Sequence, residues 1–157
     1  DIWEDPQCPV CNTFEQANGE FVEDLVRAKK AKVVYHVLSF LGNESVSAAN
    51  AAYCAADEAR YLDFHKAMYM VQPVLENSGF YSTENLIKIG SYAGLTSQSF
   101  IDCVTKGSKL DKVRAAYESM GKYNVQGTPT VFFNGKLWER KNNAFLLEEF
   151  AAAFEAS

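Results

Sequence analysis

Two thiols lie three positions apart near the start of the chain, in the segment Cys8-Pro9-Val10-Cys11. Such a pair can form a redox-active disulfide, supply half of a zinc site or form a purely structural disulfide. The other two cysteines stand far along the chain and the two histidines have no paired ligand spacing, which disfavours zinc. A loop this short constrains little of the unfolded chain, which disfavours a purely structural bond. Redox chemistry is favoured, with the other two possibilities open.

The predicted elements around the pair also favour redox chemistry. Residues 2–5 predict a short strand, and residues 9–30 carry apolar side chains every three or four positions, as a helix does. Cys8 would therefore begin a helix, whose free N–H groups and dipole stabilise a thiolate. Pro9 suits the first helical position because it has no N–H to leave unsatisfied. We expect an accessible, anionic Cys8 sulfur as nucleophile and a more shielded Cys11 as resolving thiol.

Further along, the pattern changes from strand to helix and back. Residues 33–40 are almost continuously β-branched or aromatic, which predicts a central strand covered on both faces. Residues 43–123 then predict a helical insertion, with helices after Ser45, after Ser82 or Thr83, after Thr96 and from Leu110, and a break at Pro73.

The end of the chain predicts a hairpin and a helix. Asn134-Gly135 favours a tight turn between the strands 130–133 and 136–138. A last helix from about Ala144 would place four apolar side chains on one face: Leu146, Phe150, Ala153 and Phe154. The order β-α-β, helical insert, β-β-α predicts an α/β fold in which 1–42 and 124–157 form one domain and 43–123 an inserted helical domain.

Composition excludes several classes of protein. The chain has 157 residues, 48% of them hydrophobic, which indicates a globular protein. A net charge of −5 and the lack of an extended basic cluster argue against a nucleic-acid partner. No apolar run is long enough to cross a bilayer, although the abrupt start leads us to expect a signal or anchor segment before it.

Three features together resemble the DsbA-like branch of the thioredoxin superfamily, and the resemblance extends over nearly the whole chain. They are the segment 5–11 with its two cysteines, the helical insert, and Gly127-Thr128-Pro129-Thr130 before the hairpin. The resemblance implies a thioredoxin fold and thiol–disulfide oxidoreductase activity without a cofactor. It also implies that Pro129 is a cis-proline beside the Cys8 sulfur, and that the Thr128 backbone pairs with an extended substrate, with Pro9 and Val10 supporting the site.

The resemblance further implies the location and partners of the protein. Cys54 and Cys103 look like the cross-link in the inserts of actinobacterial DsbA-like proteins, and two buried free thiols are the alternative. A persistent disulfide belongs to an oxidising compartment, so we expect an extracytoplasmic protein, with a membrane anchor outside this segment as an option. Its partners would be unfolded exported polypeptides and a membrane protein that passes electrons to a quinone. We expect a monomer.

Two departures from the family pattern affect the mechanism. Members often have a buried acid six positions before the first cysteine, where this chain has Ile2, so Glu4 and Asp5 become the candidate proton carriers. The dipeptide between the cysteines contains no histidine to support the thiolate. We therefore predict a milder oxidant than the strongly oxidising members.

Other polar residues have simpler interpretations. His36 and His65 are predicted to be packing or surface histidines. Asn43-Glu44-Ser45 matches a glycosylation sequon, but a loop leading into a helix cap explains it.

The residues leave three functions open. The first is a disulfide-forming oxidase, the second is a reductase or isomerase with the same pair, and the third is a non-catalytic thioredoxin-fold binding module.

Overall fold

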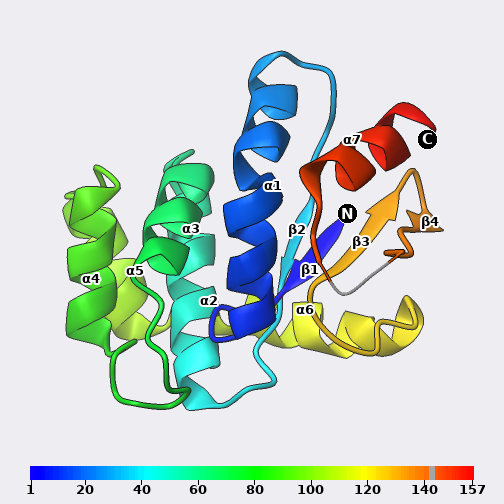
Figure 1. The fold of residues 1–157 in the computed structure, drawn as a ribbon. Helices are drawn as coiled ribbons and strands as arrows, with labels where there is room; N and C mark the ends of the chain where they lie inside the picture. The colour runs from blue at the N-terminus through cyan, green and yellow to red at the C-terminus, as the bar shows by residue number, and fades with distance from the viewer. Residues whose placement is uncertain (142–143) are drawn as a thin grey trace.

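The computed structural model describes residues 1–141 and 144–157. Its elements alternate as predicted, with a helical segment between two parts that contain the strands (Figure 1). They are β1 (Ile2–Glu4), α1 (Pro9–Arg27), β2 (Tyr35–Val37), α2 (Asn43–Asp57), α3 (Tyr61–Met70), α4 (Thr83–Tyr92), α5 (Gln98–Lys106), α6 (Leu110–Lys122), β3 (Thr130–Phe133), β4 (Lys136–Leu137) and α7 (Leu147–Glu155). The predicted α/β thioredoxin fold is confirmed.

Among the described residues the strands form one sheet in the order β2-β1-β3-β4. β1 pairs with β2 in parallel and with β3 antiparallel, and β3 pairs with β4 antiparallel. The prediction that 33–40 form a central strand is therefore wrong: only Tyr35–Val37 is a strand, and it lies at the sheet edge. Its apolar character has another cause, because the Tyr35 ring packs on Tyr61 and His65 of α3.

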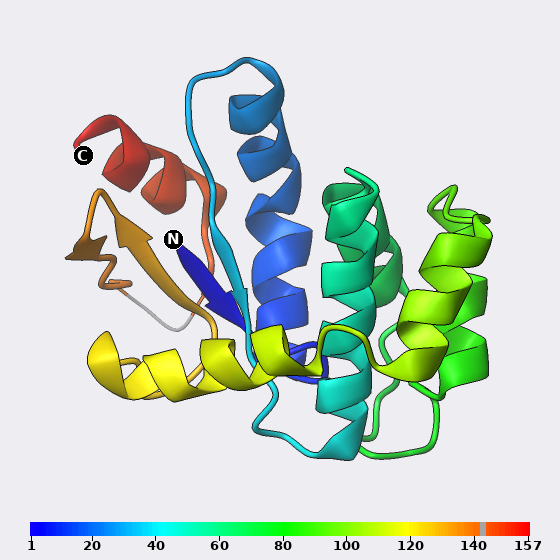
Figure 2. The ribbon, with the colours of Figure 1, turned by 180° about the vertical axis from the view of Figure 1, so that it is seen from behind.

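Alternating side chains of the strands pack on helices at both faces of the sheet, as the pleat requires. Ile2 and Val131 belong to one core cluster with residues of α1 and the α7 region. Trp3 belongs to another, against which Phe132 and Met120 of α6 pack. Figure 2 shows α6 crossing in front of the strands, with α1 and α7 behind them. The sheet therefore fixes the start of α1, which follows directly from β1.

Helices α2 to α5 of the insert lie beside α1 on the side away from β4, whereas α6 runs across the sheet (Figure 1). Its core cluster contains both Cys8 and Cys11, so the insert packs directly on the redox pair. Cys54 of α2 and Cys103 of α5 form a disulfide, with their Cα atoms 5.9 Å apart. The division into an inserted domain, 43–123, and a second domain of 1–42 and 124–157 stays a prediction.

The start of the insert differs from the sequence-based expectation. α2 begins at Asn43 rather than after Ser45, with Gly42 as its N-cap at a φ of 128°. Ser45 is buried within the first turn, because its hydroxyl bonds to Asp5. The sequon therefore lies in a helix, and its interpretation as a loop before a helix cap is wrong.

The hairpin and the last helix follow the sequence with one exception. Asn134 and Gly135 have φ values of 49° and 81°, as the predicted tight turn requires. α7 begins only at Leu147, so Leu146 is its N-cap and is 49% exposed instead of lying on the apolar face. Phe150 is buried as expected. Among the described residues no helix combines the length and the apolar character that a membrane crossing needs.

Candidate redox site

Cys8 is the N-cap of α1, and Pro9 occupies the first helical position. The Cys8 Sγ atom accepts the backbone N–H of Cys11 at 3.4 Å. A sulfur at this place replaces the oxygen of an ordinary capping residue and receives the positive end of the helix dipole. Both cysteines are free thiols in the structure.

The surroundings of the Cys8 sulfur stabilise its anion. A hydrogen bond from the Cys11 thiol is the largest cause, and together with the Thr128 hydroxyl and the N–H groups of Cys11 and Val10 it outweighs the opposing effect of burial. Together these hydrogen bonds lower the pKa of Cys8 from 9.0 to about 6. At neutral pH roughly nine-tenths of such a thiol is ionised.

Cys11 has the opposite electrostatics. Its side chain is fully buried, and this burial raises the pKa of Cys11 well above 9.0. Its hydrogen bond to Cys8 and the charge of Glu4 raise the pKa further. The two sulfurs therefore differ sharply in acidity, although they stand one helical turn apart.

The Cys8 sulfur is less accessible than the sequence led us to expect. Cys8 is only 7% exposed, while Cys11 has no exposed surface. The Thr128 carbonyl oxygen lies 3.6 Å from the Cys8 sulfur and covers it from the side of β3. A partner sulfur can therefore contact only the small exposed part of Cys8 and no part of Cys11.

The loop before β3 meets the start of α1. The Thr128-Pro129 peptide bond is cis, as the resemblance implied. The Thr128 hydroxyl is buried and has no hydrogen-bond partner in the described structure, and its nearness lowers the pKa of both cysteines. Val10 is 45% exposed beside the pair.

Asp5 fixes the redox loop and is fully buried. One of its carboxylate oxygens accepts the N–H of Gln7 at 2.9 Å and the Ser45 hydroxyl at 2.5 Å. The other accepts the N–H groups of Phe40 and Leu41 at 2.9 and 3.2 Å. Because four donors occupy this carboxylate, Asp5 joins β1 to α2 and to the segment after β2. Burial raises the pKa of Asp5, and its role as a proton carrier stays a prediction.

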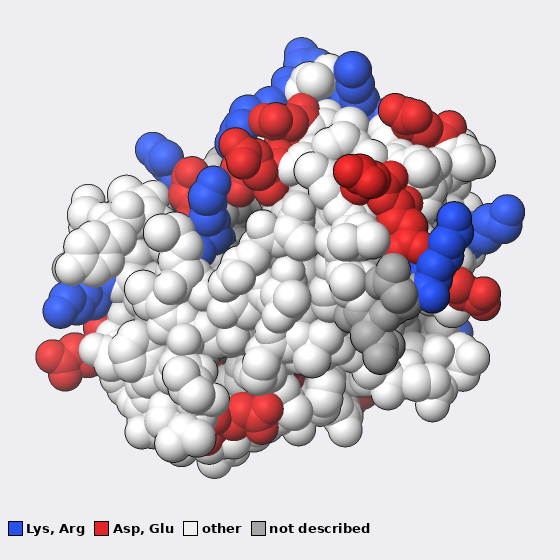
Figure 3. Space-filling view, in the orientation of Figure 1, with Lys and Arg blue, Asp and Glu red and all other residues white. Residues whose placement is uncertain are grey.

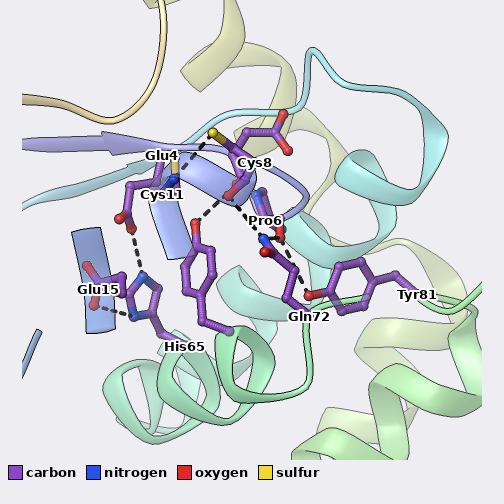
Figure 4. A network of polar contacts seen from close by, with 10 residues as sticks. Glu4, Pro6, Cys8, Cys11, Glu15, His65, Gln72 and Tyr81 are labelled. Atoms are coloured by element: carbon purple, nitrogen blue, oxygen red, sulfur yellow. Dashed lines mark hydrogen bonds and ion pairs between the residues drawn. The ribbon is translucent and has the colours of Figure 1, made fainter. Parts of the chain in front are cut away.

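Residues of the insert hold the same loop from its other side. Gln72 donates from Nε2 to the carbonyl oxygens of Pro6 and Cys8 at 2.8 and 3.1 Å. The hydroxyls of Tyr69 and Tyr81 bond to the carbonyls of Asp5 and Pro6 (Figure 4). Neither the spacing nor the type of these residues in the sequence indicates that they hold this loop.

A buried polar cluster that the sequence did not predict lies beside Cys11. His65 Nε2 of α3 is 2.8 Å from Glu4 Oε2, and His65 Nδ1 is 3.8 Å from Glu15 Oε2 of α1 (Figure 4). Glu4 and His65 are 3% and 4% exposed. His65 is a packing residue, as predicted, but it also connects two carboxyl groups. In the sequence the only sign of this cluster is that two glutamates, Glu4 and Glu15, lie on either side of the cysteine pair.

The surface near the start of α1 carries few charged side chains. In Figure 3 the centre of the face over the lower half of α1 carries few charged residues, which lie mostly around the edges of this face. The segment after α3, bonded to the redox loop through Gln72, exposes several large apolar side chains. With the last residue of α3 they are Met70, Val71, Val74 and Leu75, which are 77%, 43%, 93% and 71% exposed.

A dithiol of unequal acidity at the start of a helix, facing a Thr-Pro loop, defines the class: this chain carries a DsbA-like thiol–disulfide oxidoreductase domain. It belongs to the thioredoxin family, whose family model, described as "Thioredoxin", matches residues 1–153. The resemblance expected from the sequence is thereby confirmed.

Two solved structures of thiol–disulfide oxidoreductases agree with this assignment. The chain is similar to DsbA from Mycobacterium tuberculosis in its reduced form, with 30% identity and a TM-score of 0.83 over 99% of this chain and 79% of that one. It is equally similar to the reduced disulfide bond oxidoreductase DsbG of the same organism, at 28% identity, a TM-score of 0.83, and 99% and 75% coverage. The serine/threonine-protein kinase PknE of M. tuberculosis is 29% identical over 147 residues, 84% of this chain. The chain spans only 26% of that kinase.

Proposed function

We propose that this chain is a disulfide-forming oxidase in which Cys8 is the nucleophile and Cys11 the resolving thiol. The observation that best supports this proposal is the difference in acidity between the two sulfurs, a pKa of about 6 for Cys8 and one well above 9.0 for Cys11. A stabilised Cys8 thiolate favours the reduced form of the pair, and a pair with a stable reduced form oxidises other dithiols.

The reaction proceeds through a mixed disulfide. A substrate thiolate attacks Cys8 Sγ, a new sulfur–sulfur bond forms, and the electron pair of the Cys8–Cys11 bond passes to Cys11. The second substrate thiolate then attacks the substrate sulfur of the mixed disulfide, and Cys8 leaves as a thiolate, which its low pKa favours. The substrate is oxidised by two electrons and the Cys8/Cys11 pair is reduced by two.

Unfolded polypeptides suit this site better than a folded partner. The Thr128 backbone offers pairing to an extended chain, and Pro129 and Val10 line the approach. The exposed apolar side chains after α3 add contacts that depend little on the sequence of the substrate.

We further propose an extracytoplasmic location, supported by the Cys54–Cys103 disulfide, and a membrane quinone-linked partner that reoxidises the pair. We also propose that the protein is a monomer.

The decisive experiment equilibrates the Cys8/Cys11 pair with glutathione redox buffers and also follows recovery of activity by a reduced, unfolded ribonuclease. We expect a reduction potential clearly above the roughly −270 mV of thioredoxin, and recovery that requires Cys8. The double variant Cys54→Ser with Cys103→Ser is the matched control, because it removes two cysteines outside the pair. A potential at or below that of thioredoxin would favour the reductase or isomerase alternative, and full recovery with Cys8→Ser would favour the binding module.

A further inference from the structure

Gln72, which follows α3 in the helical insert, bonds directly to the backbone of Cys8. Its Nε2 atom donates to the carbonyl oxygens of Pro6 and Cys8, at 2.8 and 3.1 Å (Figure 4). An amide nitrogen carries two hydrogens, so one glutamine side chain can satisfy both carbonyls at once. Gln72 therefore fixes the peptide units on both sides of the Gln7–Cys8 pair.

The Cys8 carbonyl belongs to the geometry that directs the Cys8 sulfur. It also accepts the N–H of Asn12 at 3.2 Å, which is the first backbone hydrogen bond of α1. As the N-cap, Cys8 has an extended backbone, with a φ of −71° and a ψ of 114°. This conformation turns its side chain back to the N–H of Cys11, 3.4 Å from the sulfur. A second donor on the same carbonyl restricts the backbone that aims the sulfur.

A short strap between α3 and α4, residues 72–77, is bonded to the redox loop at both of its ends. Gln72 holds the first end. At the other end the Asn77 N–H donates to Gln7 Oε1 at 2.7 Å, and Gln7 is only 2% exposed. Asn77 has a φ of 51°, a left-handed conformation that asparagine adopts more readily than most residues. The two ends of the strap are therefore tied to the residues that surround Cys8.

The middle of the strap holds two large apolar side chains in solvent. Val74 and Leu75 are 93% and 71% exposed. The chain that follows the strap is also fixed, because the Glu44 carboxylate accepts the N–H groups of Gly79 and Tyr81 at 2.6 and 2.7 Å. Clustered apolar side chains on a surface are typical of a site that contacts another molecule. A polypeptide that covers them touches a segment whose ends are bonded beside the nucleophile.

Other donors of the insert bond to the same loop, but they differ from Gln72 in burial. The hydroxyls of Tyr69 and Tyr81 bond to the carbonyls of Asp5 and Pro6, and these tyrosines are core residues, 3% and 1% exposed. Gln72 is only partly buried. Its contribution therefore comes from two hydrogen bonds more than from packing, so an apolar side chain of the same shape isolates that contribution.

We propose that Gln72 is a positioning residue for thiol–disulfide exchange, which aims the Cys8 sulfur and ties it to the strap that binds apolar side chains of a polypeptide substrate. This inference rests on the proposed role of Cys8 as the nucleophile. It assigns a preference for polypeptides that carry an apolar side chain close to the reacting cysteine, since one side chain joins the strap to Cys8. Binding energy gained at the strap then helps to hold Cys8 in the orientation for in-line attack.

The first test is Gln72→Met, which keeps the shape of the side chain and removes both donors. Stopped flow measures the rate at which a small dithiol opens the Cys8–Cys11 disulfide, and ultraviolet absorbance follows the thiolate of the reduced protein against pH. We expect the rate to fall about tenfold, because a small misplacement of a reacting atom is costly. The absorbance midpoint should rise, because the sulfur is less well aligned with the N–H of Cys11.

Asn50→Leu is the matched control, because Asn50 is another amide that bridges two backbone groups of the insert. It donates to the Val104 carbonyl at 3.5 Å and accepts the Lys109 N–H at 2.8 Å, both at the connection between α5 and α6. Asn50→Leu should lower the free energy of unfolding but keep the wild-type dithiol rate and absorbance midpoint. The same pattern in Gln72→Met would overturn the proposal. Gln72→Asn, one methylene shorter, keeps the amide for the fold and should give an intermediate rate.

A double-mutant cycle tests the link between the strap and Cys8. With Gln72 present, Val74→Ser combined with Leu75→Ser should raise KM for an unfolded polypeptide about tenfold. In the Gln72→Met background the same pair should raise KM less than about threefold, because binding energy is then spent on ordering a strap that has lost one attachment. Equal effects in the two backgrounds would overturn the link. If the wild-type disulfide does not react with the dithiol, the proposed function fails instead.

Discussion

The Cys8 sulfur accepts the backbone N–H of Cys11 at 3.4 Å, and the neighbouring Cys11 thiol is the largest cause of the lowered pKa of Cys8. The resolving cysteine thus makes its partner acidic. In the reduced protein, ultraviolet thiolate absorbance should rise with a midpoint at about pH 6. Cys11→Ala should move that midpoint upward, whereas Cys11→Ser, which retains a donor, should move it less. A wild-type midpoint near 9.0 would contradict the assignment of Cys8.

The Thr128 hydroxyl supplies a separate part of this stabilisation. Thr128→Val preserves the shape of the side chain and removes a donor that is buried without another partner. The pKa of Cys8 should rise, and its alkylation at acidic pH should slow roughly tenfold, because a hydrogen bond to a charged group contributes about 1.5–3 kcal/mol. Thr105→Val, on α5, provides a control that should react at the wild-type rate.

Stability of the reduced protein should depend on pH through Cys8. Its folded pKa is about 6 and its ordinary value 9.0, so between these values the folded state binds fewer protons than the unfolded state. This contribution to the free energy of unfolding is full above pH 9 and is lost as pH falls through 6. Glu4, with its raised pKa, acts in the opposite direction but is present in both redox forms.

Comparison of the two redox forms isolates the thiol contribution. Urea unfolding of reduced and oxidised protein at several pH values gives the difference between their free energies of unfolding. The free energy of unfolding of the reduced protein minus that of the oxidised protein should increase with pH between about 6 and 9, since Cys8 titrates only when reduced. A flat or falling difference would be incompatible with a stabilised Cys8 thiolate.

The Asp5 carboxylate is predicted to be structural. Asp5→Asn places an amide where two of its four donors point, so at least one buried N–H or hydroxyl loses its acceptor. We expect a loss of about 1–3 kcal/mol in the free energy of unfolding by urea titration. Asp111→Asn is the control, since its side chain is 97% exposed and surface changes usually stay within about 0.5 kcal/mol. Equal stability of the two variants would refute the role of Asp5.

The apolar segment after α3 is predicted to bind substrate. Val74→Ser combined with Leu75→Ser should raise KM for an unfolded polypeptide about tenfold, because each buried apolar side chain contributes about 1.5–3 kcal/mol at most. The rate with a small dithiol and the pKa of Cys8 should not change. Leu137→Ser, on the exposed strand β4 and away from α3, should leave KM unaltered. An unchanged KM in the double variant would place substrate binding elsewhere.

The sequence by itself determined the features that depend on short stretches of chain. The Cys8-Pro9-Val10-Cys11 segment at the start of a helix, the Asn134-Gly135 hairpin and most helices of the insert follow from residue type and spacing. The family resemblance added the fold, because it joined three such segments into one order. These features are local, so neighbouring residues are enough to specify them.

Only the tertiary structure decided what surrounds the two sulfurs. It showed that Tyr35–Val37 is an edge strand covered by α3, that Cys8 is nearly buried, and that four donors occupy Asp5. It also brought His65 to Glu4 across 61 positions of sequence. Burial and contacts between distant residues set these properties, and the energies involved arise from packed neighbours that no local pattern specifies.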